Sequence, residues 1–331
     1  MATMPYRDAL RLALHEEMTR DERVVLMGEE VGLYGGAYAV SKGLLDAFGP
    51  ERVIDTPISE ASIVGVGVGA ALTGLRPVVE LMYVDFLGLV MDQVGNQAAK
   101  WRYMSGGRLT VPMVLRTQGG TGRSAGAQHS QSLESWIMHV PGLRLVMPAT
   151  PADARGLLTT AIRSDDPVVF IEHKALYALK GEVPDEAEPI PFGRARVARE
   201  GSDVSVITYS RMVHVALEAA ERMREQGVAV EVIDLRTLNP LDLDAITASV
   251  RKTGRAIVVS EAHKTCSVSS ELAVLIYEHA GDALRAPVRR VAGKDVPIPS
   301  APALERAAVP SVDEVVEAIV GTGLGKERAH A

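Results

Sequence analysis

Short, continuous apolar runs recur along the chain and constrain its fold more than any other sequence feature. The first five lie at 24–27, 53–54, 77–80, 113–115 and 168–171. Runs without polar–apolar alternation are typical of strands buried on both faces of a parallel sheet. Helical patterns lie between several of them, at 63–72, 86–102 and 151–164. The sequence therefore predicts an α/β fold.

A second α/β series follows a break after Lys180. The segment 181–201 contains three prolines and many charges, which indicates a connector with one edge strand. Strands are expected at 204–208, 228–235, 256–260 and 288–291, and helices at 213–226, 243–252, 268–280 and 312–320, before a frayed tail at 321–331. We predict two doubly wound α/β domains, at 1–185 and 201–325, with a linker at 186–200.

Composition excludes several classes of function. The 331 residues suit about two domains. The net charge is −7 and basic residues are dispersed, which argues against nucleic-acid binding. The longest weakly polar run, 63–75, is shorter than the roughly 20 residues of a membrane helix. A single cysteine, Cys266, excludes an intramolecular disulfide and suits a cytoplasmic location.

Two glycine-rich segments suggest nucleotide binding. Gly65, Gly67 and Ala70 fit the loose G-x-G-x-x-A pattern of dinucleotide-binding domains. About ten residues separate them from the preceding strand, so a helix that packs closely is the better interpretation. The loop 118–128 (QGGTGRSAGAQ) lacks the lysine of a P-loop. A mobile active-site loop is favoured there over a phosphate cradle.

The segment 55–60 (DTPISE) lies between an expected strand and an expected helix. Pro57 stiffens the turn, Ser59 is a candidate cap, and Glu60 falls in the first helical turn. Taken alone, Glu60 is best explained as a carboxylate that complements the helix dipole, worth about 0.3–1 kcal/mol.

The neighbouring motifs change that interpretation. The segment 55–60 resembles a signature of the β subunits of pyruvate, branched-chain and acetoin dehydrogenases. Further similar motifs follow in family order: GEE at 28–30, GLRPV at 74–78, DQ at 92–93, NQAAK at 96–100, YMSGG at 103–107, QHSQ at 128–131, PGL at 141–143 and DLRTLNPLD at 234–242. The resemblance spans essentially the whole chain.

The resemblance implies a thiamine-diphosphate pyrimidine-binding domain followed by a transketolase-type C-terminal domain. The carboxylate of Glu60 would hydrogen-bond N1′ of the aminopyrimidine. This bond favours the 4′-imino tautomer, which takes the proton from thiazolium C2. Phe86 matches the family's aromatic residue on the pyrimidine ring, and Met82 matches its apolar neighbour. Glu29 matches an acid near the relay, and Ile58 is expected to line the same pocket.

His129 matches the family's active-site histidine in its Gln-His-Ser setting. Its imidazole titrates near neutral pH, which suits proton transfer while an acyl group passes to lipoamide. Glu261 and His263 follow a strand of the second domain, where ligands often bind, but no partner indicates a direct catalytic role.

The chain lacks the Gly-Asp-Gly motif with which family members hold Mg²⁺ on the diphosphate. The resemblance implies that an α subunit supplies these ligands, in an α2β2 heterotetramer with the cofactor at each α–β interface. It also implies docking to a dihydrolipoyl acyltransferase core that carries the lipoyl domain. Carbonyl groups from Ala161 to Asp166 are candidates for a K⁺ site, although Ser164 stands where pyruvate-type relatives tend to have Asp.

The substrate stays open between alternatives. The motifs are most similar to bacterial pyruvate-type and acetoin-type subunits, and the branched-chain type ranks below them. Leu89 stands where many pyruvate-type relatives have Gln. A pyruvate dehydrogenase-type β subunit is the leading hypothesis and an acetoin dehydrogenase β subunit the alternative. A nicotinamide-binding dehydrogenase and a non-catalytic assembly protein are further alternatives.

Overall fold

The computed structural model describes residues 1–186 and 188–324. It divides into two compact units, one made of Met1–Gly119 with Trp136–Phe192, the other of Gly120–Ser135 with the chain from Gly193 onward. The sequence pattern places 120–135 in the first domain. In the structure this segment groups with the second unit, where its polar groups bond to side chains that come much later in the chain. No described helix is long and apolar enough to cross a membrane.

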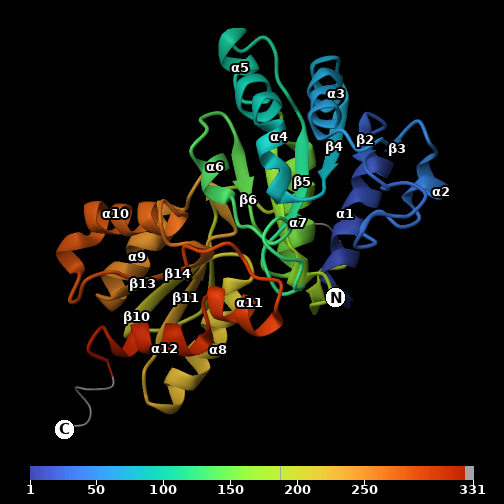
Figure 1. The fold of residues 1–331 in the computed structure, drawn as a ribbon. Helices are drawn as coiled ribbons and strands as arrows, with labels where there is room; N and C mark the ends of the chain where they lie inside the picture. The colour runs from blue at the N-terminus through green and yellow to red at the C-terminus, as the bar shows by residue number, and fades with distance from the viewer. Residues whose placement is uncertain (187, 325–331) are drawn as a thin grey trace. The chain divides into compact units, whose positions relative to one another are not determined.

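The first unit is built on a parallel sheet with strand order β6-β7-β5-β4-β2-β3 (Figure 1). Its strands are β2 (Val24–Gly28), β3 (Val53–Asp55), β4 (Arg76–Leu81), β5 (Val114–Gly119), β6 (Arg144–Val146) and β7 (Val168–His173). A separate antiparallel pair joins β1 (Ala2–Pro5) to β8 (Lys180–Val183). The apolar runs predicted as strands here all form strands.

Helices cover both faces of this sheet. On one face lie α1 (Tyr6–Arg20) and α7 (Pro151–Arg163), which pack on each other. Their core includes Leu10, Leu14, Leu157 and Phe170, all fully buried. The other face carries α3 (Glu60–Leu72), with α4 (Leu87–Met91) and η2 (Asp92–Ala98) beside it. Short helices α2 (Leu44–Phe48), η1 (Val84–Phe86), α5 (Trp101–Met104) and η3 (Lys174–Leu176) complete the unit, with α6 (Glu134–Met138) at its junction with the 120–135 segment.

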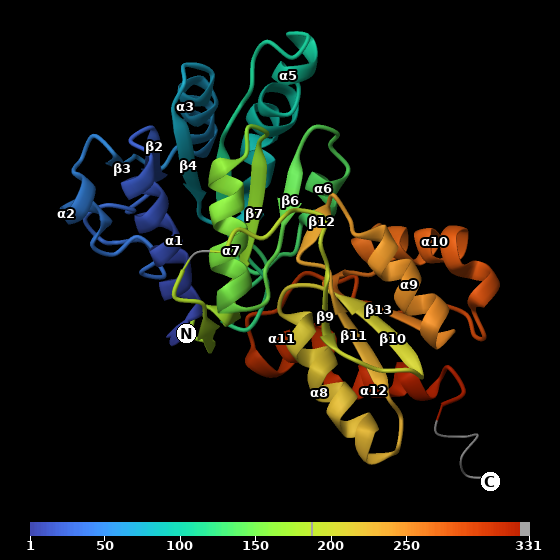
Figure 2. The same cartoon turned by 180° about the vertical axis from the view of Figure 1, so that it is seen from behind.

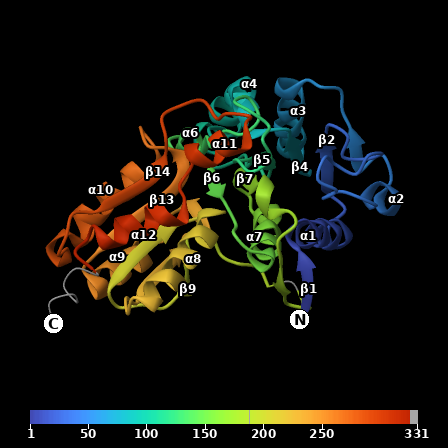
Figure 3. The same ribbon diagram turned by 60° about the horizontal axis from the view of Figure 1, so that its bottom comes forward.

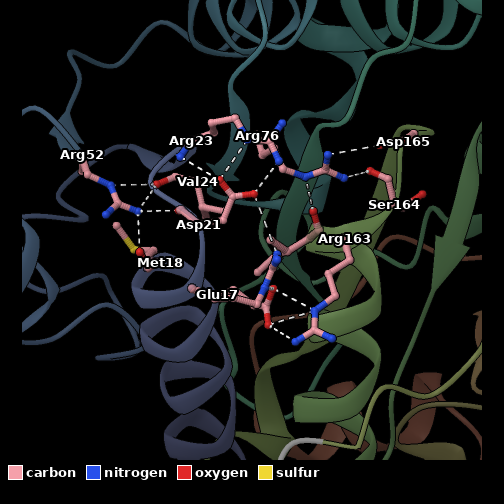
Figure 4. A network of polar contacts seen from close by, with 12 residues as sticks. Glu17, Met18, Asp21, Arg23, Val24, Arg52, Arg76, Arg163, Ser164 and Asp165 are labelled. Carbon is pink, nitrogen blue, oxygen red and sulfur yellow. Dashed lines mark hydrogen bonds and ion pairs between the residues drawn. The ribbon is translucent and has the colours of Figure 1, made fainter.

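Helix α1, which sequence analysis does not predict, is held by arginines at its C-terminal end (Figure 4). Arg163 of α7 donates to the buried carboxylate of Glu17 at 2.7 Å. Arg52 donates to the carbonyl oxygens of Met18 at 2.8 Å and Asp21 at 3.0 Å. A cation at this end complements the helix dipole and satisfies carbonyl groups that lack a partner within the helix.

The second unit is also doubly wound, with strand order β14-β13-β10-β11-β9. Its strands are β10 (Val204–Thr208), β11 (Val230–Asp234), β13 (Ala256–His263), β14 (Arg289–Gly293) and the antiparallel edge strand β9 (Arg196–Arg199), with β12 (Thr237–Asn239) apart. Helices α8 (Met212–Glu225) and α12 (Val312–Val320) pack on one face, and α9 (Leu243–Thr253) and α10 (Val268–Ala280) on the other (Figures 2 and 3). Short helices η4 (Gly281–Ala283) and α11 (Pro302–Ala308) follow α10. The prediction of two doubly wound α/β domains is confirmed.

Two local predictions differ from the structure. The stretch 86–102 is not one helix: α4 passes into the wider turns of η2, a π-helix, and α5 follows separately. Apolar periodicity does not distinguish these hydrogen-bonding patterns. The connector 181–201 contributes its predicted edge strand as β9. The expected tail begins as a turn at 321–324, and 325–331 lie outside the described residues.

Gly67 sets the separation between α3 and the sheet. A Cβ atom on Gly67 would come within 2.6 Å of Cγ2 of Val79 on β4 and 3.1 Å of the sulfur of Met113. The glycines at 65, 67 and 69 lie inside α3, not in a turn directly after a strand. This placement does not fit a dinucleotide-binding turn, and it fits the predicted close packing of the helix.

A pair of glycines tests close packing in the first unit. Gly142 has φ +101° and its added Cβ would stand 2.1 Å from the carbonyl oxygen of Ala99, whereas Gly74 has φ +106° and open space. Gly74→Ala should cost about 1–3 kcal/mol of unfolding free energy from backbone strain alone. Gly142→Ala should cost at least about 1–3 kcal/mol more, because backbone must shift. Urea unfolding followed by fluorescence of Trp101 and Trp136, both in this unit, measures the difference; equal losses would contradict the predicted overlap.

Candidate active site

The predicted site residues of the first unit gather at the C-terminal edge of its sheet. Glu29 follows β2, Glu60 follows β3, and Met82 and Phe86 follow β4. Strand β2 lies between β3 and β4, and all three are parallel. Their C-terminal ends therefore meet at one edge, where ligands bind in open α/β sheets.

Glu60 is the first residue of α3, as predicted. Ser59 occupies the cap position, but its hydroxyl bonds to Ser62 Oγ at 3.1 Å and makes no cap hydrogen bond to the helix. The expectation that Ser59 caps the helix with its side chain is therefore wrong. Within the part of the chain that the structure describes, no donor is paired with the half-buried Glu60 carboxylate. This carboxylate is available to accept a hydrogen bond from a ligand.

Glu29 lies close enough to Glu60 for their charges to interact. Burial raises the pKa of Glu29, and repulsion from Glu60, Glu30 and Glu80 raises it further. Gly28 permits the tight passage between β2 and Glu29, because a Cβ there would stand 2.8 Å from the carbonyl oxygen of Glu80. The structure thus brings together the two carboxylates that the sequence pattern singles out.

Asp55 holds the loop that follows Glu29. Its carboxylate accepts hydrogen bonds from the backbone N–H groups of Gly32 at 2.6 Å and Leu33 at 3.0 Å. Thr56 N–H donates to the carbonyl oxygen of Gly28 at 3.0 Å. The acidic start of the 55–60 motif therefore ties the β2 loop to the β3 loop, a role that sequence analysis does not assign.

The apolar candidates stand around the same edge. Met82 directly follows β4 and Phe86 closes η1, and both side chains are half-buried. Ile58 lies in the loop before α3 and is 79% exposed, so it packs on no core of this chain. Their contact with a cofactor stays a prediction.

A buried ionic network lies at the ends of the central strands. Arg116 on β5 donates to Glu172 on β7 at 2.7 and 2.8 Å and to Glu80 on β4 at 2.7 Å. Tyr177 donates to Glu172 at 2.5 Å and Gln118 to Glu80 at 3.0 Å. Burial by itself lowers the pKa of Arg116, but the two carboxylates outweigh it and raise that pKa. Charged residues inside apolar strands were the sequence signal for this network, which sequence analysis missed.

The segment proposed for K⁺ is already engaged by donors. Arg76 donates to the carbonyl oxygens of Ile162 at 2.9 Å and Ser164 at 2.7 Å (Figure 4). The carbonyl of Ala161 accepts from Ser164 N–H, and that of Asp166 accepts from Ser164 Oγ. Burial works against ionisation of Asp166, but hydrogen bonds from Arg144 and Arg102 lower its pKa. Arg76 thus bonds to two carbonyl groups of this segment, whereas the carbonyls of Ala161 and Asp166 each accept a hydrogen bond from Ser164. K⁺ binding here stays a prediction.

His129 belongs to the second unit, in the segment Gly120–Ser135. Its side chain is half-buried, and its N–H donates to the carbonyl oxygen of Gly126 at 3.3 Å. At the end of the segment, the buried Glu134 accepts a hydrogen bond from Tyr209 at 2.7 Å, and burial raises the pKa of Glu134. Hydrogen bonds within the same unit thus engage both the turn before the histidine and the end of its segment. The mobility expected of this loop stays a prediction.

Glu261 also holds this loop. Its Oε1 accepts from Thr121 N–H at 2.6 Å and from Thr121 Oγ1 at 2.9 Å, and Arg211 donates to Oε2 at 3.4 Å. His263 Nδ1 lies 2.6 Å from the carbonyl oxygen of Lys294. Both residues follow the β13 core, where sequence analysis noted them, and the contacts of Glu261 position a neighbouring segment.

The pKa of Glu29 predicts how stability varies with pH. A carboxyl group whose pKa is raised by folding binds more protons in the folded state, so its contribution to stability falls as pH rises from about 4.5 through the raised value. Glu29→Gln removes that loss. The unfolding free energy of the variant minus that of the wild type should therefore rise as pH rises through the pKa of Glu29, and then level off. In a Glu60→Gln background the rise should be smaller. Urea unfolding in steps of pH measures both. A flat difference would contradict the raised pKa of Glu29, and an equal rise in the two backgrounds would contradict the proximity of the two carboxylates.

Comparison with known proteins agrees with this arrangement. Residues 2–180 match the transketolase pyrimidine-binding domain and residues 193–315 match the transketolase C-terminal domain. A solved split-gene transketolase, described as an inactive β4 tetramer, superposes with a TM-score of 0.80 over 96% of this chain and 98% of that chain, at 23% identity. This last likeness shows the fold.

Curated relatives are similar over nearly the full chain. The pyruvate dehydrogenase E1 component subunit beta-2 of Oryza sativa, a mitochondrial protein, is 50% identical over 95% of this chain and 85% of its own length. The E1 subunit beta of Rickettsia felis is 48% identical over 95% and 96%. The acetoin:2,6-dichlorophenolindophenol oxidoreductase subunit beta of Cupriavidus necator is 45% identical over 94% of both chains. The chain therefore belongs to the transketolase-like family of 2-oxo acid and acetoin dehydrogenase β subunits.

Proposed function

We propose that this chain is the β subunit of a thiamine-diphosphate-dependent 2-oxo acid dehydrogenase, with Glu60 as its main catalytic residue. The observation that carries the proposal is the Glu60 carboxylate at the start of α3, half-buried, beside Glu29 and without a described protein donor. An oxygen acceptor of this kind suits the N–H of an aminopyrimidine ring. The site thus fits the cofactor that family membership implies.

The residues of this chain divide the work of binding and proton transfer. Glu60 accepts a hydrogen bond at pyrimidine N1′, and Phe86 and Met82 offer apolar contact to the ring. Burial and repulsion from Glu60 raise the pKa of Glu29, so the charges of the two carboxyl groups interact at the site. Ile58 is exposed towards a ligand or a partner chain. Thiamine diphosphate, when bound, supplies the carbanion chemistry.

His129 is proposed to move a proton while the acyl group passes to lipoamide. Its imidazole is half-buried, and its backbone N–H is held in a turn by the carbonyl oxygen of Gly126. Histidine is the side chain most often used for proton transfer in active sites. Reduction of a lipoyl disulfide is the step in which we place it.

The partners follow from what the sequence lacks and what its relatives are named. We propose that an α subunit in an α2β2 heterotetramer holds the diphosphate and Mg²⁺, since Gly-Asp-Gly does not occur in this chain. A dihydrolipoyl acyltransferase core with its lipoyl domain is the proposed acceptor. A reducing compartment such as the cytoplasm suits the exposed thiol of Cys266.

Pyruvate is the proposed substrate, and acetoin the alternative. Several similar curated chains are named as pyruvate dehydrogenase subunits, and one acetoin-oxidising subunit is 45% identical over almost its whole length. Leu89, which distinguishes this chain from many pyruvate-type relatives, is 56% exposed and so is available to a ligand or a partner. Branched 2-oxo acids rank below both. Assays of the co-expressed αβ complex with all three substrates and an artificial electron acceptor decide between them.

Glu60→Gln tests the catalytic assignment. General acid–base groups contribute about 10²–10⁴-fold, so turnover of the αβ complex should fall at least about 100-fold while the chain still folds. If Glu60 only complemented the helix dipole, the change would cost about 1 kcal/mol of stability or less and spare the activity. Asp244→Asn, which changes an exposed carboxylate in the first turn of α9, is the matched control and should retain activity. Retention of more than about a tenth of wild-type turnover in Glu60→Gln would refute the assignment.

A further inference from the structure

The loop that carries His129 is closed at its base. Gly120 N–H donates to the carbonyl oxygen of Gln131 at 2.9 Å, which brings the two ends of the loop together. The buried Glu261 accepts both polar hydrogens of Thr121. These contacts fix where the loop starts and ends, but they do not reach the residues in its middle.

The middle of the loop forms a concave group of backbone N–H donors. Gly122 and Ser124 both have positive φ, +95° and +55°. Backbone N–H groups that converge in a turn form a concave site that binds anions. Here the anion is a side chain of the same unit: Glu305 of α11 accepts from Gly122 N–H at 2.9 Å and from Ser124 N–H at 3.1 and 3.2 Å, and Ser124 Oγ lies 3.3 Å away.

Glu305 is buried, with 4% of its surface exposed, so these hydrogen bonds compete little with water. The chain next to α11 makes a second approach to the loop, where Ser300 Cβ would lie 3.6 Å from a Cβ on Gly126. The carbonyl of Gly126 in turn accepts the N–H of His129. Residues 300–305 therefore contact the loop at positions 122–126, on the N-terminal side of the histidine. The last of these residues, Gly126, is hydrogen-bonded to the backbone of His129.

We propose that Glu305 is a positioning residue for His129. Its carboxylate occupies the anion site of the 122–124 turn and holds the loop in the conformation that presents the imidazole. This inference rests on the proposed role of His129 in acyl transfer. A charged acceptor is required because it serves two N–H groups and a hydroxyl together, whereas a neutral amide oxygen binds them more weakly.

Limited trypsin digestion of the full chain tests the anchor without any assay of activity. Arg123 is exposed in the middle of the anchored turn, so cleavage after it reports how often the turn opens. Cleavage should accelerate at least about tenfold in Glu305→Ala and by a smaller factor in Glu305→Gln. Glu314→Gln is the matched control, because Glu314 also accepts a backbone N–H, that of Ser311 at 2.8 Å, at the start of α12. Wild-type cleavage rates in both Glu305 variants would overturn the anchor.

Two rates of the αβ complex then separate positioning from a merely structural role. Acylation of a free lipoyl domain depends on the proposed step of His129, whereas reduction of an artificial electron acceptor bypasses it. In Glu305→Gln the ratio of the first rate to the second should fall about tenfold to a hundredfold, as displaced catalytic groups do. An equal fall in both rates, or an unchanged ratio, would overturn the proposal.

His129→Ala distinguishes the failure of this inference from that of the proposed function. If His129→Ala lowers the ratio and Glu305→Gln does not, only the positioning role is refuted. If His129→Ala leaves the ratio unchanged, the assigned role of His129 fails, and with it the positioning proposal. Should Glu305→Gln not fold, Glu305→Asp keeps the charge but shortens the reach, and the same fall in the ratio is expected.

Discussion

The guanidinium of Arg116 is the group on which the edge of the first sheet that carries the candidate site depends. It is fully buried, and a buried cation needs both neutralising charge and hydrogen bonds. Glu80 and Glu172 supply these from the two strands beside β5. Three strand ends are thereby joined just before the chain leaves the sheet. Glu80 also repels the charge of Glu29, so the network contributes to the proton affinity of the candidate site itself.

Much of the fold could be predicted because strands covered on both faces must be apolar throughout. The strands at 24–28 and 168–173 follow from this rule alone. Helix α1 is not predicted, although Tyr6, Leu10, Leu14 and Met18 recur every four residues and are buried in the structure. The π-helical turn at 92–98 carries no apolar pattern of its own.

The candidate site could be predicted residue by residue but not as an arrangement. The position of Glu60 follows from a strand, a proline-containing turn and a helix in succession. Its closeness to Glu29 depends on β2 and β3 being neighbours, which chain order does not state. The unit to which His129 belongs depends on Glu261 and Glu305, side chains that are far away in sequence. Arg76, which donates to two carbonyl groups of the 161–166 segment, lies in another motif, so the sequence pattern does not indicate this contact.

Gly67 determines the position of Glu60 through the packing of α3 on the sheet. The helix that begins at Glu60 rests on β4 through a residue without a side chain, and the space that a methyl group would need is filled by Val79 and Met113. The height of the carboxylate above the sheet is thus determined two turns away. Any larger residue at position 67 would tilt or lift α3 and move the carboxylate with its chemistry intact. The packing between α3 and β4 thus controls where the carboxylate stands, although neither Val79 nor Met113 is among the residues that carry the proposed chemistry.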